Sequence, residues 1–257
     1  MKINDNALEV FEAAIERAQR MSRLYHDLVD TRSRAMRSDW ATSFEKFMKW
    51  PTGKALARID GHEAIIVLKD GAELKSEDFS SDQMRDLLRA SIMMGSSAMD
   101  AYFHRKIICY LVRFAKQGKS APRELRTQQV SVQDFAKAID RDRVWGELRR
   151  VFDRQLGYRS FISPGKITEG LNLIAVADFW EKTASRMSYE KGKLREHVEW
   201  IASRRNKIAH EGDLSTQKRN FGKTNALEPK DAVWALDFLG EFVNAADQEI
   251  NDQLEAK

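Results

Sequence analysis

The chain has 257 residues, of which 42% are hydrophobic and 32% charged, with only 13 glycines and 4 prolines. This composition can bury a core, and it excludes collagen-like, linker-rich and turn-dense all-β chains. No stretch reaches the roughly 20 apolar residues of a membrane span, and the start, MKINDN, lacks the apolar segment of a secretion signal. The single cysteine, Cys109, excludes an internal disulfide and a multi-cysteine zinc site, so we expect a cytoplasmic protein without a membrane anchor.

Positive charge is concentrated in the middle of the chain. Residues 81–230 carry 29 Lys and Arg against 18 Asp and Glu, whereas residues 231–257 carry 1 against 7. A basic segment of this kind favours contact with a polyanion such as RNA or DNA. A solvated Arg-rich surface with an acidic helix folded against it explains the charge equally well.

The first 80 residues differ in pattern from the rest. Residues 5–37 contain no Pro or Gly, and their apolar positions recur every three to four residues, which predicts one long amphipathic helix. A short helix is predicted over Trp40–Lys49. The β-branched segment Glu63–Leu68 lies between two Asp-Gly pairs and is the one good hairpin signal. We therefore interpret residues 1–80 as an N-terminal extension.

From residue 81 onward the sequence predicts helices joined by polar loops. The predicted helices cover 81–116, 131–140, 142–156, 168–187, 189–210 and a last one that begins at Pro229, with loops at 117–129, 157–165 and 211–227. Gly212 is a plausible helix stop, and Pro229 is tolerated at a first helical position. The predicted fold class is all-α: an antiparallel helical bundle over residues 81–257, preceded by a helical extension with a small β-hairpin.

The densest polar cluster is the segment 204–213, RRNKIAHEGD, at the end of a predicted helix. Cations at a helix C-terminus complement the helix dipole, so part of the cluster is ordinary capping. Capping does not explain why His210 follows Asn206 just before a glycine. On a regular helix Arg205 and His210 lie about 140° apart, so they share a cleft only if the last turn loosens or a second subunit completes the cleft.

This cluster resembles the motif of the HEPN superfamily (higher eukaryote and prokaryote nucleotide-binding domain). That motif is an Arg, usually followed by a polar residue, and then a His four to six residues on, here Arg205-Asn206-Lys-Ile-Ala-His210. The stretch 96–103, SSAMDAYF, is similar to the first helix of the RiboL-PSP-like branch, where an acidic residue precedes an aromatic pair. The resemblance covers about residues 82–250 and implies a bundle of four or five helices.

The resemblance implies a homodimeric endoribonuclease that needs neither metal nor cofactor. A ribose 2′-OH would attack the adjacent phosphate and leave a 2′,3′-cyclic phosphate and a 5′-OH. His210 would serve as general base or acid, since imidazole exchanges protons near neutrality. Arg205 would neutralise charge on the phosphate oxygens, and Asn206 would orient the phosphate or His210.

The same resemblance implies supporting roles for other residues. Asp100 would orient Arg205 or His210, although a surface carboxylate explains it equally well, while Arg204 and Lys207 would hold backbone phosphates. The implied biological role is a toxin or an abortive-infection effector against phage, with room for an antitoxin or regulatory protein partner. Some HEPN toxins carry a modifiable Tyr where this chain has Gly212, so that form of neutralisation is not expected.

Two other interpretations stay open. The chain could be a non-catalytic HEPN-like module that binds RNA or protein through the same basic surface, or a helical interaction protein whose motif is only a cap. We expect His104 and His197 to be surface residues and Cys109 to lie in the core. Three tryptophans also fall at core-like positions: Trp180, Trp200 and Trp234.

Overall fold

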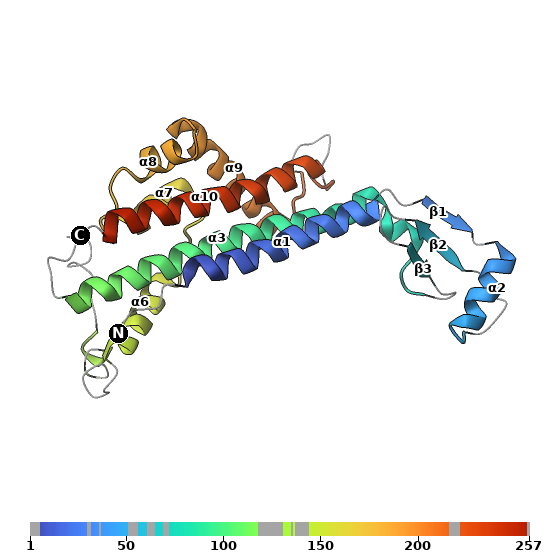
Figure 1. Cartoon of the computed structure of the whole chain (residues 1–257), viewed down its shortest axis with the longest axis horizontal. Coiled ribbons are helices and arrows are strands. Elements are labelled where there is room, and N and C mark those ends of the chain that lie inside the picture. The colour runs from blue at the N-terminus through green and yellow to red at the C-terminus, as the bar shows by residue number, and fades with distance from the viewer. Residues whose placement is uncertain are drawn as a thin grey trace. The chain divides into compact units, whose positions relative to one another are not determined.

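The computed structural model describes residues 6–29, 32–35, 37–50, 56–60, 65–68, 72–117, 131–134, 136, 144–215 and 222–255. Its helices are α1 Ala7–Val29, α2 Ser38–Phe47, α3 Ser81–Gln117, α6 Val144–Leu156, α7 Pro164–Asn172, α8 Phe179–Arg186, α9 Lys191–Glu211 and α10 Pro229–Glu255, with a 3-10 helix η1 Ser76–Phe79. Its strands are β1 Arg32–Ala35, β2 Ala57–Asp60 and β3 Ile65–Leu68. The predicted fold class, an all-α bundle with a small hairpin in the N-terminal extension, is confirmed (Figure 1).

The chain divides into two compact units. The first contains residues 1–16, 92–225 and 234–257, and the second contains 17–91 and 226–233. Helices α1, α3 and α10 each contribute residues to both units.

The second unit contains a three-stranded antiparallel sheet in the order β1-β2-β3. Strands β2 and β3 form the predicted hairpin, with Ala57 opposite Leu68. Strand β1 pairs with the other edge of β2. The prediction of one helix over residues 5–37 is therefore wrong in its last part, because α1 ends at Val29 and β1 follows. Pairing with a segment more than 20 residues away decides this change, and nothing local in the sequence marks it.

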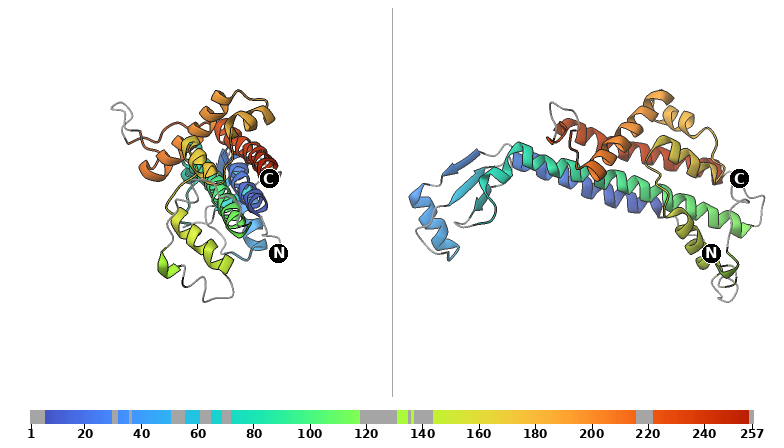
Figure 2. Two further views of the ribbon diagram at one scale, coloured as in Figure 1. Left: turned by 90° about the vertical axis from the view of Figure 1, so that its left-hand side faces the viewer. Right: turned by 180° about the vertical axis from the view of Figure 1, so that it is seen from behind.

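The core of the first unit lies between α1, α3 and α10. The ring of Phe11 contacts that of Tyr102 at 6.2 Å. A Cβ on Gly95 of α3 would lie 2.7 Å from a methyl carbon of Leu236 and 3.3 Å from one of Ile15, so this glycine allows close approach of three helices. The pairs Phe11–Tyr102 and Ile15–Gly95 show that α1 runs antiparallel to α3. The pairs Leu236–Gly95 and Asp247–Tyr102 show that α10 runs parallel to α3 (Figures 1 and 2).

A buried polar network joins α3 to α10. Lys106, only 2% exposed, pairs with Asp247 at 2.8 Å and donates a hydrogen bond to Asn251 Oδ1 at 2.8 Å. The Tyr102 hydroxyl donates to Asp247 at 2.9 Å, and the Tyr110 hydroxyl donates to Asn251 at 3.0 Å. Buried charges are tolerated when they are paired in this way, and the network sets the register of the two helices.

The predicted helix 168–187 is two helices, α7 and α8. Between them Ala175 and Asp178 adopt left-handed backbone angles, with φ of 55° and 52°. The side chain of Gln253 in α10 bonds both backbone groups of Ala177, accepting from its N–H at 2.9 Å and donating to its carbonyl at 2.8 Å. A side chain 76 residues away thus supplies hydrogen bonds to the backbone where the helix is interrupted. Local periodicity cannot reveal this interruption.

Three further predicted segments lie partly outside the described residues. Helix 142–156 is found as Val144–Leu156. The predicted loop 117–129 lies outside the described residues except for Gln117, the last residue of α3. Of the predicted helix 131–140, the described residues 132–134 and 136 are helical.

Candidate functional site

Helix α9 carries the Arg-to-His motif. Its buried side chains are Leu194, Val198, Ile201 and Ala202. The helix remains regular through Glu211 and ends at Gly212, whose φ of 60° is left-handed. The last turn does not loosen before His210, so the angular offset between Arg205 and His210 stays at about 140°.

Arg205 lies on the packed side of α9. It follows Val198 and Ile201 at helical spacing and precedes the half-buried Ile208. The Nε atom of Arg205 is buried and has no hydrogen-bond partner among the described residues. Its Nη1 donates to Asn206 Oδ1 at 3.1 Å. The Arg205 guanidinium therefore has one buried donor without a partner in the described part of the chain and one donor bonded to Asn206.

His210, Asn206 and Lys207 are exposed on α9. The structure thus brings Asn206 to Arg205 through a hydrogen bond and places His210 in the last turn, on a different side of the helix. Within one chain the two proposed catalytic side chains do not share a helix face.

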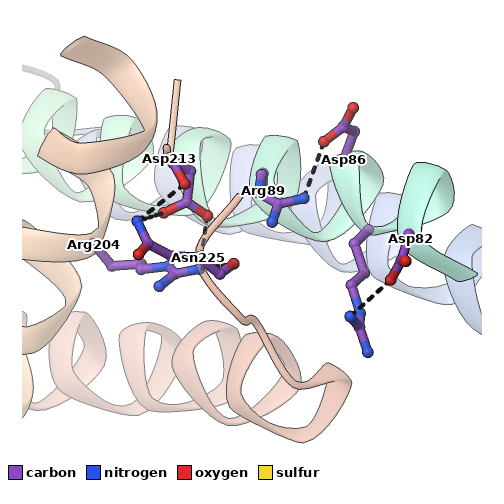
Figure 3. A network of polar contacts seen from close by, with 7 residues as sticks. Asp82, Asp86, Arg89, Arg204, Asp213 and Asn225 are labelled. Atoms are coloured by element: carbon purple, nitrogen blue, oxygen red, sulfur yellow. Dashed lines mark hydrogen bonds and ion pairs between the residues drawn. The ribbon is translucent and has the colours of Figure 1, made fainter. Parts of the chain in front are cut away.

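Arg204 has a structural partner (Figure 3). Its Nη2 donates to Asp213 Oδ2 at 2.7 Å and to the Asn225 carbonyl at 3.3 Å. The Asp213 side chain is 0% exposed, and that of Arg204 is 13% exposed. This buried ion pair fixes the turn after α9, so the predicted phosphate contact of Arg204 competes with an interaction already made.

The segment after α9 folds back on itself. Gly212 and Asp213 are successive left-handed residues, with φ of 60° and 57°. The Asn225 backbone N–H donates to the Asp213 carbonyl at 2.7 Å, and Leu214 forms a β-bridge with Thr224. The motif therefore ends at a turn held by both backbone and side-chain bonds.

Asp100 bonds to the segment before α7 and to its own helix. Its Oδ1 accepts from the Phe161 N–H at 2.6 Å, and its Oδ2 accepts from the Ser160 hydroxyl at 3.4 Å. His104, one turn along α3, lies 3.7 Å from the Asp100 carboxylate and 2.6 Å from the Arg159 carbonyl. Among the described residues these contacts give Asp100 a structural role, and its proposed contact with Arg205 or His210 stays a prediction.

Two side chains of α9 differ from the sequence predictions, which placed His197 at the surface and Trp200 in the core. His197 lies against the rings of Tyr189, Trp234 and Phe238 at 5.0–5.4 Å. Burial lowers the pKa of His197 below its usual value, the charge of Lys193 lowers the pKa further, and Glu196 opposes both effects. Trp200 was predicted to lie in the core, but its side chain is 37% exposed. By contrast, Cys109 and Trp180 are buried as predicted.

A cavity of about 190 Å³ lies where α7, α8 and α9 meet. The Arg195 guanidinium lies 5.5 Å from the centre of the Trp180 ring at its wall. None of the predicted site residues lines this cavity.

Neither the family models, nor the curated proteins, nor the solved structures contain a match to this chain. Within the described ranges, no group of three or more His, Cys, Asp or Glu is placed to hold a metal ion. The described helices include none that is both long and apolar enough to cross a membrane.

Proposed function

We propose that this chain is a metal-independent endoribonuclease of the HEPN type, in which Arg205 and His210 carry out the cleavage and Asn206 assists. The observation that carries the proposal is the end of α9. There, His210, Asn206 and Lys207 are exposed, and the Arg205 guanidinium donates a hydrogen bond to Asn206.

The chemistry needs one group to accept a proton and one to donate a proton. The ribose 2′-OH attacks the phosphorus and loses its proton to a base, and the departing 5′-oxygen receives a proton from an acid. A homodimer supplies two copies of His210 for these two tasks. Arg205 stabilises the charge that develops on the phosphate oxygens. DNA lacks the attacking hydroxyl, so the substrate is RNA.

The geometry of one chain explains why a second copy is part of the proposal. Arg205 and His210 point about 140° apart on a regular helix. In a two-fold dimer that meets along α9, the two copies of Arg205 and His210 would flank one contact between the subunits. We place this enzyme in the cytoplasm as a toxin or anti-phage effector, with an antitoxin or regulatory protein as an expected partner.

The test is cleavage of a mixed-sequence, end-labelled RNA in EDTA. The wild type should cut, and Arg205→Ala and His210→Ala should each lose at least about 100-fold in rate, the usual contribution of a charge-stabilising donor and of a general acid or base, respectively. All three proteins must first be shown to be folded and to have the same oligomeric state. Equal cutting by all three would remove both residues from the mechanism.

A second candidate is a non-catalytic module that binds RNA or protein through the same surface. The separation of Arg205 and His210 on different sides of α9 favours it if the chain is monomeric. RNA binding without cleavage by a monomeric wild type would support this candidate over the first.

A further inference from the structure

Trp200 lies on the solvent side of α9, although it is a large aromatic residue. Its side chain is 37% exposed, and one edge is held by Trp234, with the ring centres 5.3 Å apart at an angle of 74°. Trp234 in turn stacks on Phe238 at 5.6 Å. The indole of Trp200 is therefore backed by fixed rings and keeps part of its own surface open.

Trp200 shares a side of α9 with the end of the motif. Trp200, Ser203, Lys207 and His210 follow each other at spacings of three, four and three residues, and all four are exposed. Trp200 and Lys207 point within about 20° of each other on a regular helix, and His210 lies about 15 Å further along the axis than Trp200. His210 also lies about 80° around the axis from Trp200, so the exposed aromatic platform, the cation and the proposed catalytic histidine occupy one half of the helix surface.

We propose that Trp200 is a stacking subsite for one unpaired base of a single-stranded RNA, while Lys207 contacts the backbone between that base and His210. The inference rests on the proposed function, because it takes RNA as the ligand. Stacking on an aromatic side chain accepts every base, since each has a π-face. The distance along α9 places this base a few nucleotides from the bond that is cut.

The charges near Trp200 agree with a base rather than a phosphate at this position. Glu199, the preceding residue, is exposed and repels phosphate, and Glu196, one turn earlier, pairs with Lys193 at 3.2 Å. The cation on this half of the helix surface, Lys207, lies nearer the histidine. A strand that passes along α9 would therefore place its backbone at the C-terminal end and a base on the indole.

The test measures binding of a fluorescent single-stranded RNA by anisotropy in EDTA, with every protein carrying His210→Ala so that no RNA is cut. Trp200→Ala should weaken binding about 5- to 160-fold, the range for loss of one base–aromatic stack. Trp200→Phe should recover most of that loss. Trp145→Ala is the matched control, because Trp145 lies on α6 with a similar exposure of 41% and should leave affinity unchanged.

Two further measurements separate stacking from charge and from misfolding. Trp200→Ala should keep the salt dependence of binding, whereas Lys207→Ala should lower the slope of log affinity against log salt by about 1. An RNA with abasic sites should bind wild type and Trp200→Ala with equal affinity, because it offers no base to stack.

Unchanged affinity in Trp200→Ala, or an equal loss in Trp145→Ala, would overturn the subsite. So would a change of oligomeric state in Trp200→Ala, which would assign this face to contact with a second copy. The two proposals can fail separately. If the wild type cuts RNA but Trp200→Ala binds RNA as tightly as the wild type, only the proposed subsite is wrong. If RNA binding depends on Trp200 but the protein with His210 intact does not cut RNA, only the proposed nuclease activity is wrong.

Discussion

Arg204 and Arg205 are neighbours in sequence and have opposite surroundings. Arg204 pairs with the buried Asp213, while Arg205 keeps a guanidinium whose hydrogen bond goes to the exposed Asn206. The sequence predicted a dense cationic end to this helix but could not separate the two arginines. Their difference depends on Asp213 and Asn225, which return to the helix only after the chain has turned.

Trp200 illustrates a different limit of sequence reasoning. The sequence analysis assigned it a core-like position, and the structure leaves it partly exposed beside Trp234. A hydrophobic residue at the border of an apolar stripe is buried or exposed according to what packs above it. Here Trp234 of α10 covers part of the ring.

His197 makes a prediction about pH at the residue scale. The pKa of His197 is lowered from 6.5 mainly by burial among aromatic rings, so the unfolded chain binds a proton more tightly than the folded chain. Its contribution to stability is present above pH 6.5 and is lost as the pH falls through the folded-state pKa. The unfolding free energy of wild type relative to His197→Gln should therefore be larger at pH 7.5 than at pH 5.5.

Urea denaturation at the two pH values checks this, because groups other than His197 titrate in both proteins and cancel in the difference. A difference that is independent of pH would mean that His197 is as well solvated in the folded protein as in the unfolded chain.

At the scale of elements, the sequence located most helices and missed where tertiary contacts interrupt them. Helix α3 was predicted to within one residue at its C-terminal end, because the polar segment that begins at Gln117, with Gly118 and Pro122, marks the stop. The break between α7 and α8 was missed, since Gln253 of α10 supplies the bonds that the interrupted backbone needs. Strand β1 was missed because only its pairing with β2 distinguishes it from a continuing helix.

The two glycines of α9 should respond in opposite ways to alanine. Gly212 has a φ of 60°, and a Cβ there would meet nothing closer than 3.9 Å, so the cost of Gly212→Ala is backbone strain of about 1 kcal/mol. Gly192 lies in the first turn of α9 with open space around it, so Gly192→Ala should stabilise by about 0.5 kcal/mol. Chemical denaturation of both variants tests the pair, and equal signs would contradict the assigned end of α9.

At the scale of the whole molecule, composition and periodicity were enough to predict the helical class and the hairpin of the extension. They could not predict that α1, α3 and α10 each supply residues to two compact units, because unit boundaries depend on which distant segments pack together. The candidate site shows the same difference between what the sequence predicts and what depends on the fold. The residues of the motif were found from their order in the sequence, and their surroundings needed the fold.

The central claim is that RNA is cut by attack of its own 2′-OH. The direct measurement compares an RNA with a twin that carries a single 2′-deoxy nucleotide at the mapped cut site, both incubated with wild type in EDTA and analysed by mass spectrometry. The account predicts 2′,3′-cyclic phosphate and 5′-OH ends from the first RNA and no cut at that site in its twin. Cutting of the twin at the same site, or an uncut first RNA, would contradict it.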